Sequence, residues 1–246
     1  MEDLIRDAYA HCEALVREVD RDRFLASLFA PAARRPHLHA LYAFDIEVAR
    51  IAPVVNEALA GELRLQWWRE ALAGRVPEQV AAHPVAAALV ATIAECALPT
   101  DPLDRLIDTR ALDLYDDPLS TLDELASHGL QTASAVFELA ARILDRDAHV
   151  AEVAGPAGIA VTFVGSLQDP AHLKTRIAIP RAGLAARARE ALEQARRNWH
   201  AVSPAARPAF LTLALVSAAL ARDEPIRLAP WRRQWLLWRA ARRGRF

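Results

Sequence analysis

The acidic side chains at helical spacing are the residues of this chain with the clearest capacity for chemistry. Asp113 and Asp117 are four residues apart in the stretch DLYDD, so on a helix their carboxylates would share one face. Paired carboxylates offer the hard oxygen ligands that Mg²⁺ prefers. The favoured interpretation is nevertheless a solvated helix end, because acidic residues gather in such turns and Pro118 ends the helix.

A second acidic residue lies in an apolar segment. Asp45 follows Tyr42 by three residues, and Arg50 follows five residues later. A half-buried Asp45–Arg50 ion pair and a ligand site are equally consistent with this pattern. The two cysteines, Cys12 and Cys96, are too few and too far apart to predict a disulfide framework or a zinc site.

The C-terminal segment is aromatic and basic. Seven Arg and no acidic residue follow position 224, which leaves 23 basic against 31 acidic side chains, a balance of −8, in the preceding chain. Three tryptophans are spaced so that they would lie on one side of a helix, and arginines flank them. Together they form a candidate membrane or partner surface: Trp231, Arg232, Trp235, Trp238, Arg239 and Arg242. Tryptophan favours the headgroup region and arginine favours anionic lipid. The alternative is that the Trp side chains pack in the core and the Arg side chains are solvated.

Helices must position these residues, since the chain is rich in Ala and Leu and holds only 8 Gly. We predict an all-α fold with one domain over residues 1–246, because there is no linker, repeat or run with strand periodicity. The predicted helices are 4–19, 36–51, 61–73, 84–97, 103–114, 121–144 (opened by a Thr121–Glu124 capping box), 150–167, 184–200, 208–221 and 230–243. In 150–167 three glycines, Gly155, Gly158 and Gly165, predict close helix packing. The longest uncharged runs fall short of the roughly 20 residues of a membrane span, and we expect a cytoplasmic protein.

Three blocks resemble the squalene/phytoene synthase superfamily: DRDRFLASLFAPAARRPHLHALYAFDIEVARI, GELRLQWWREAL and AGPAGIAVTFVGSLQDPAHLKTRIAIP. Their order and spacing cover nearly the whole chain. The resemblance implies an isoprenoid-synthase-like helical bundle around a central cavity. Enzymes of this type join two isoprenyl diphosphates head to head, with Mg²⁺ held by a DxxxD pair on each of two facing helices.

The chain departs from that pattern at the metal positions. The first acidic pair corresponds to Ala49 and Pro53, neither of which can bind a metal ion. In the second pair Asp169 matches the first acid, but Leu173 stands at the position of its partner. Because one carboxylate of four remains, we expect no cofactor, no metal site and no catalytic residue.

The resemblance also assigns the residues that line the cavity. Phe137 stands where the family has a small residue, and Thr162 and Gly165 replace a Gln and an Asn. The expected lining is therefore Tyr42, Asp45, Ala49, Phe137, Thr162, Gly165 and Asp169. We expect this cavity to be narrower than that of the enzymes and still able to hold a lipid or prenyl ligand.

Within the superfamily, the chain is similar to the branch that includes the mitochondrial assembly factor for respiratory complex I. The stretches LYAFDIEVARI, LRLQWWREAL, HPVAAAL and SPAARPAFLTLAL carry this similarity. It implies a non-catalytic protein for assembly or binding at a membrane surface, peripheral to the inner membrane, whose partner is a membrane-protein client and not a nucleic acid. The alternative is a prenyl transferase whose altered Mg²⁺ site uses Asp45, Asp113, Asp117 and Asp169.

Overall fold

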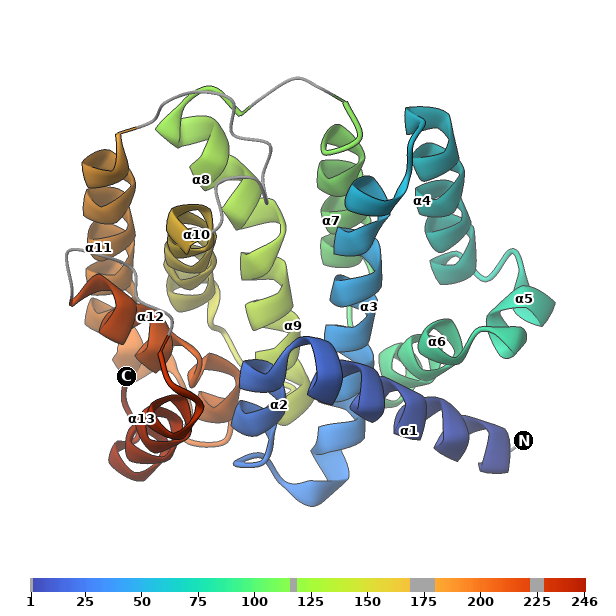
Figure 1. Ribbon diagram of the computed structural model, residues 1–246. Coiled ribbons are helices and arrows are strands. Elements are labelled where there is room, and N and C mark those ends of the chain that lie inside the picture. The colour runs from blue at the N-terminus through green and yellow to red at the C-terminus, as the bar shows by residue number, and fades with distance from the viewer. Residues whose placement is uncertain (1, 116–118, 169–179, 222–227) are drawn as a thin grey trace.

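The computed structural model is built of α-helices, and it describes residues 2–115, 119–168, 180–221 and 228–246 (Figure 1). No β-strand occurs in these ranges, which confirms the all-α prediction. The α-helices are α1 (Glu2–Val19), α2 (Arg21–Ser27), α3 (Arg35–Val54), α4 (Ala58–Leu72), α5 (Pro77–Ala82), α6 (Pro84–Cys96), α7 (Asp101–Leu112), α8 (Leu122–Gln131), α9 (Ala133–Leu144), α10 (Ala151–Gln168), α11 (Arg181–Arg197), α12 (Leu213–Leu220) and α13 (Pro230–Arg243). Short 3-10 helices cover Ala32–Arg34 (η1), Trp199–Ala201 (η2) and Arg207–Phe210 (η3).

Local signals account for several helix starts. Thr121 and Glu124 form the predicted capping box at the start of α8, in which each side chain accepts a hydrogen bond from the other residue's backbone N–H. Proline occupies the first turn of α3, α5, α6, α7 and α13, where no intrahelical donor is lost.

The helix predicted over residues 121–144 is two helices in the structure. Thr132, with φ −107° and ψ −83°, separates α8 from α9, and its hydroxyl donates to the His128 carbonyl at 2.7 Å. This side-chain bond competes with regular helix geometry. Residues 208–221 likewise divide into η3 and α12, and α2 and α5 are short helices that the sequence pattern did not predict.

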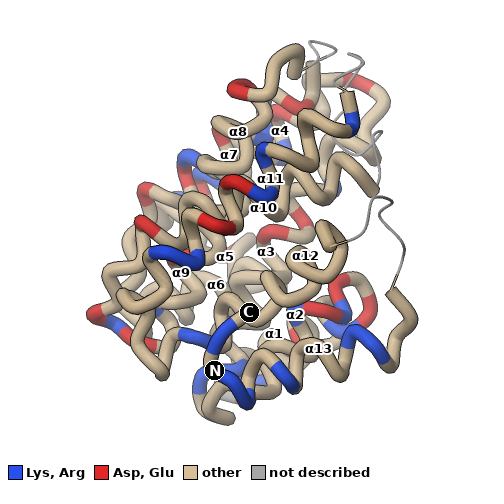
Figure 2. Tube along the Cα trace, turned by 90° about the vertical axis from the view of Figure 1, so that its left-hand side faces the viewer, with Lys and Arg blue, Asp and Glu red and all other residues tan. Residues whose placement is uncertain are grey.

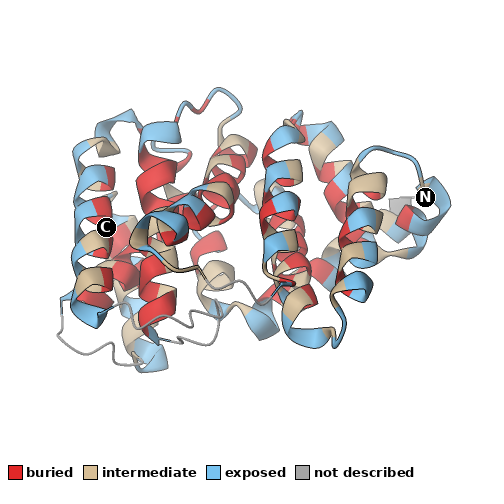
Figure 3. Ribbon diagram, turned by 90° about the horizontal axis from the view of Figure 1, so that it is seen from above, coloured by how far each residue is buried: buried red, intermediate tan, exposed pale blue. Residues whose placement is uncertain are grey.

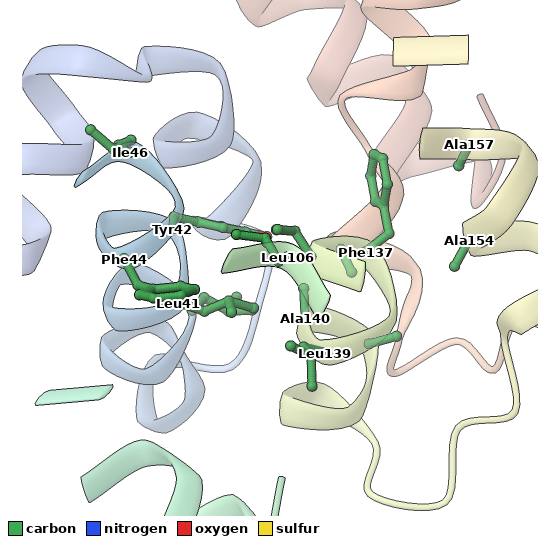
Figure 4. Packing of buried hydrophobic residues seen from close by; sticks show 14 of the residues in the cluster. Leu41, Tyr42, Phe44, Ile46, Leu106, Phe137, Leu139, Ala140, Ala154 and Ala157 are labelled. Carbon is green, nitrogen blue, oxygen red and sulfur yellow. The ribbon is translucent and has the colours of Figure 1, made fainter. Parts of the chain in front are cut away.

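The core forms around α3, which packs against α1, α6, α7 and α9. Leu38, Leu41 and Phe44 of this helix are almost fully buried. In the close-up the Tyr42 side chain points from α3 toward α9 (Figure 4). Viewed from above, the helices turn buried residues toward one another and exposed residues outward (Figure 3). None of the helices in the described ranges has both the length and the apolar character needed to cross a membrane.

Small residues let α10 approach α9 closely. Gly158 lies against the first turn of α9, where an added Cβ would come within 2.7 Å of the Ser134 Cα. The Ser134 hydroxyl donates to the Gly155 carbonyl at 2.9 Å and ties the two helices together. The predicted packing role of Gly165 is wrong, because no atom lies within 4 Å of where its Cβ would be.

These two glycines make a matched test of the helix contact. We expect Gly158→Ala to destabilise the protein by about 3 kcal/mol, since the clash is with backbone atoms that cannot move independently. Gly165→Ala should stabilise it by roughly 0.5 kcal/mol, because alanine restricts the unfolded chain and meets open space. Urea denaturation followed by far-ultraviolet circular dichroism measures both. Equal effects of the two substitutions would contradict the close contact at Gly158.

Candidate functional site

A cavity of about 480 Å³ lies between α3, α9, α10 and α12. One part of its wall is apolar and is formed by residues such as Val136, Phe137, Val161, Val164, Leu215 and Val216. The other part is charged and is formed by Asp20, Asp22, Arg23, Asp45, Arg110, His128 and Arg233. An apolar space with one charged end is therefore present, as the family resemblance implies.

The charged end is organised around Asp45 of α3. Arg23 of α2 donates from Nη1 to Asp45 Oδ2 at 2.7 Å, and Arg110 Nη2 of α7 lies 3.8 Å from Asp45 Oδ1. The Asp45 and Arg110 side chains are each only 13% exposed. Both carboxylate oxygens of Asp45 thus face guanidinium groups in a region with little water, where an unpaired charge would be costly.

Arg110 is shared with a second carboxylate. Its Nη1 donates to Asp113 Oδ2 at 3.2 Å, and His128 Nε2 lies 3.1 Å from Asp113 Oδ1. Burial acts to raise the pKa of Asp113, but the hydrogen bond from His128 and the charge of Arg110 outweigh it and lower that pKa. Asp113 is therefore ionised at neutral pH. We call the connected side chains Arg23, Asp45, Arg110, Asp113 and His128 the ion chain.

The N-terminal end of α2 extends the ion chain. Asp20 accepts a hydrogen bond from the Arg23 backbone N–H at 3.0 Å and also pairs with the Arg23 guanidinium. Burial opposes ionisation of Asp20, yet Arg23 holds its pKa below the usual value. The same guanidinium lies 4.9 Å from the centre of the Tyr42 ring, and burial raises the pKa of the Tyr42 hydroxyl. Tyr42 is therefore uncharged and forms part of the cavity wall at the charged end.

The structure brings most of the predicted lining residues to one place. Tyr42, Asp45, Phe137, Thr162 and Gly165 all line the cavity. Phe137 stacks on Phe210 with ring centres 5.3 Å apart and forms part of the cavity wall. Ala49 is partly buried farther along α3 and is absent from the lining formed by the described residues. Asp117 and Asp169 lie outside the described residues.

Two sequence interpretations are wrong. Asp45 does not pair with Arg50, which is exposed; its partners are Arg23 and Arg110 from other helices. Asp113 is not a merely solvated helix end, because its side chain is 23% exposed and bound by two neighbours. The ion chain contains three residues that the sequence reasoning did not select: Arg23, Arg110 and His128. Of the contacts in the ion chain, only the Arg110–Asp113 pair could have been predicted from the sequence, because these residues are three positions apart on a helix.

The donor set at the charged end does not suit Mg²⁺. Each oxygen of Asp45 and Asp113 already faces a guanidinium or imidazole N–H. A Mg²⁺ ion needs near-octahedral oxygen ligands at about 2.1 Å, so it would have to displace these cations from the same oxygens. Within the described ranges, no three His, Cys, Asp or Glu side chains are grouped closely enough to hold a metal ion. The first predicted pair position, Ala49 and Pro53, adds no oxygen ligand.

Helix α13 forms a second candidate surface. Its Trp231, Trp235 and Trp238 side chains are 71%, 47% and 50% exposed, which excludes the alternative that they are core residues. Arg239 lies 5.1 Å from the Trp235 ring centre, and Arg242 lies 5.5 Å from that of Trp238. Figure 2 shows basic residues along α13 and no acidic ones. Arg232 is partly buried on the same helix.

The opposite face of α13 attaches the helix to the rest of the protein. Leu237 and Ala240 are buried against α2 and α12, and Arg233 forms an ion pair with Asp22 of α2. Gly244 ends the helix with φ +62°, and its carbonyl accepts a hydrogen bond from Trp199 Nε1 at 2.8 Å. A rigidly held helix therefore exposes the aromatic and basic stripe.

Comparisons with known proteins agree with this architecture. The family model described as squalene/phytoene synthase matches residues 16–184. Among solved structures, a dehydrosqualene synthase in complex with a ligand superposes with a TM-score of 0.83 at 16% identity, covering 98% of this chain and 97% of the other. The squalene synthase HpnC from Alicyclobacillus acidocaldarius superposes with a TM-score of 0.67 at 23% identity and the same coverage. At these identities the two structures show a shared fold.

Curated relatives carry another name. The NADH dehydrogenase (ubiquinone) complex I, assembly factor 6, of Rattus norvegicus is 30% identical over 174 residues, which cover 70% of this chain and 52% of that protein. The protein of the same name from Homo sapiens is 29% identical over 164 residues, or 66% of this chain and 49% of that protein. The chain thus spans about half the length of the curated relatives it matches.

The ion chain can be tested through Arg110. We expect Arg110→Met to destabilise the protein by roughly 3 kcal/mol at pH 7, because Asp45 and Asp113 lose the cation they share. The deficit should shrink as pH falls through the lowered pKa of Asp113, since protonation removes the carboxylate charge that the missing guanidinium neutralised. Urea denaturation at pH 7 and at pH 3.5 measures this difference.

Arg69→Met is the matched control. Arg69 pairs with Asp108 at 2.7 Å, but the Asp108 side chain is 66% exposed, so the cost should stay below about 1 kcal/mol. An equal loss of stability in the two variants would show that Arg110 contributes no more than an exposed ion-pair partner does.

Proposed function

The chain belongs to the squalene/phytoene synthase family, and we propose that it is a non-catalytic member that serves the assembly of respiratory complex I at a membrane surface. The observation that carries this proposal is the sharing of Arg110 by Asp45 and Asp113. Both carboxylates are bound by a side-chain cation, so these oxygens are not free to bind Mg²⁺. The names of the curated relatives supply the assembly role.

The charged end is unsuited to diphosphate ionisation for a further reason. A leaving diphosphate needs cations that are available to it, whereas Arg23 and Arg110 are each bound to two carboxylates. Transferring either guanidinium to a substrate would take a cation away from two partly buried carboxylates, which is unfavourable. The apolar end still offers space for an apolar chain, so a lipid or prenyl ligand remains compatible with the fold.

Helix α13 supports the membrane part of the proposal. Exposed tryptophans next to arginines combine an affinity for the headgroup region with attraction to anionic lipid, worth about 1 kcal/mol for each basic residue near the surface. Because the helix is held by its opposite face, the stripe is arranged for binding before it meets a bilayer. We infer that the protein binds peripherally through this face.

The functional test has a cellular and a chemical arm. Deleting the gene in its own organism should lower the amount of assembled complex I on native gels, and the wild-type gene should restore it. The purified protein should release no diphosphate from farnesyl or geranylgeranyl diphosphate with Mg²⁺, under conditions in which an active squalene synthase does. Normal complex I in the deletion strain would refute the assembly role. Diphosphate release that Asp45→Asn abolishes would instead establish the prenyl transferase alternative.

Flotation with liposomes tests the membrane surface. We expect the protein to float with vesicles containing anionic lipid at low salt and to remain soluble at high salt, because salt screens the arginines. The triple variant Trp231→Ala, Trp235→Ala, Trp238→Ala should lose flotation without a change in melting temperature, since these side chains are exposed. Leu4→Ala with Leu112→Ala, two exposed residues on other helices, is the control. Flotation unchanged in the triple variant would refute binding through α13.

A further inference from the structure

A second concave surface lies far from both the cavity and α13. It is an open groove of about 510 Å³ between α3, α4 and the start of α6, and it shares no lining residue with the cavity. Figure 1 places α4 and α5 at one side of the molecule and α13 at the other. We call this groove, lined by Glu47, Arg50, Ile51, Val54, Leu63, Arg64, Trp67, Trp68 and His83, the α3–α4 groove.

Its floor is an aromatic cluster. The ring centres of Trp67 and Trp68 are 5.0 Å apart, and His83 packs on both at 4.9 and 5.5 Å. His83 is fixed in place because its Nδ1 accepts a hydrogen bond from the Ala86 backbone N–H at the start of α6. Ile51 and Trp68 are buried beneath this surface, so the floor is rigid.

The rim exposes large apolar side chains in one place. Val54 at the end of α3 and Leu63 on α4 are each 64% exposed, and Leu59, one turn before Leu63, is 63% exposed. Single exposed apolar residues are common, but a group beside an aromatic floor is typical of an interaction site. The apolar rim continues the α3–α4 groove along one side of α4.

The charges of the groove favour an anionic partner. Arg50 and Arg64 are exposed at the rim, and neither has a carboxylate within 4.0 Å among the described residues. Glu47 is partly buried, 3.5 Å from His83 Nε2. Burial raises the pKa of Glu47 to about 7, with Arg50 acting against that shift, so its carboxylate carries less than a full charge at neutral pH. Burial also lowers the pKa of His83, which is neutral there.

Three of the sequence stretches that carry the similarity to the assembly-factor branch meet in the same groove. LYAFDIEVARI supplies Glu47, Arg50 and Ile51, LRLQWWREAL supplies the residues of α4, and HPVAAAL supplies His83. Val54 is the one lining residue outside these stretches. None of the lining residues contributes to the cavity that an isoprenoid substrate would occupy.

We propose that the α3–α4 groove binds an amphipathic helix of a partner protein, which places apolar side chains on the tryptophan floor and carboxylates beside Arg50 and Arg64. Tryptophan and arginine are the residues that most often dominate binding energy at protein interfaces. A groove open at its rim, between helices, is suited to a helix presenting side chains at i, i+3, i+4 and i+7. This inference rests on the proposed function only in taking the partner to be an assembly client.

The probe is a pair of synthetic helical peptides. Both carry leucine and phenylalanine on one face, and they differ in having glutamate or lysine along its edges. By fluorescence anisotropy, we expect the glutamate peptide to bind at least about tenfold more tightly than the lysine peptide. Leu63→Asp and Val54→Asp should each weaken the glutamate peptide roughly tenfold. Arg64→Glu should move the preference toward the lysine peptide.

Leu112→Asp is the matched control, since Leu112 is 65% exposed at the end of α7 and lies outside the groove. It should leave binding of the glutamate peptide unchanged, and melting temperatures should show that every variant is folded. Equal binding of the two peptides, or binding that Leu63→Asp does not weaken, would overturn the proposal. So would a dimer in sedimentation that Leu63→Asp converts to monomers, because the occupant would then be a second copy of this chain.

A cellular arm separates this proposal from the proposed function. In the deletion strain, the Leu63→Asp gene should fail to restore complex I while the Leu112→Asp gene restores it. Full rescue by Leu63→Asp would overturn the groove as the client site and leave the assembly role standing. If deletion has no effect on complex I, the assembly role fails, whereas the peptide measurements still decide whether the groove binds an acidic helix.

Discussion

One guanidinium group, that of Arg110, is the interaction on which the site depends. It lies between Asp45 on α3 and Asp113 at the end of α7, and through Asp113 it connects to His128 on α8. Three charged or polar side chains from three parts of the bundle are thereby connected through one cation. Removing one partner of a partly buried ion pair lowers stability by more than the intact pair adds to it. The arrangement therefore specifies which helices must be neighbours. The same cation faces Oδ1 of Asp45 and Oδ2 of Asp113, two oxygens of the type that Mg²⁺ binds.

Fold and chemistry are therefore separable in this molecule. The helices pack through apolar residues such as Leu41, Phe44 and Leu106, none of which touches the charged end. Those contacts supply the hydrophobic stability, and they are indifferent to whether carboxylates or arginines stand at one end of the cavity. This explains how the chain can superpose on a dehydrosqualene synthase with a TM-score of 0.83 at only 16% identity.

The sequence predicted the elements better than the contacts between them. Helix positions follow from local signals, and the Thr121–Glu124 box and the bounds of α13 agree with the prediction. The break at Thr132 depends on a hydroxyl that finds a nearby carbonyl, which apolar periodicity does not record. The sequence offers Arg50 as an ion-pair partner for Asp45, because the actual partners, 22 and 65 positions away, cannot be identified without a three-dimensional arrangement.

Arg233 shows why the outward and inward faces of α13 have to be considered together. Its guanidinium pairs with Asp22 and lines the cavity, while the tryptophans of the same helix face outward. Burial raises the pKa of Asp22, and Arg233 acts against that shift. This ion pair links α13 to α2. Arg233 and the buried Leu237 therefore connect the helix that carries the exposed stripe to the helices around the cavity. The candidate membrane surface and the wall of the cavity are thus joined by a single helix.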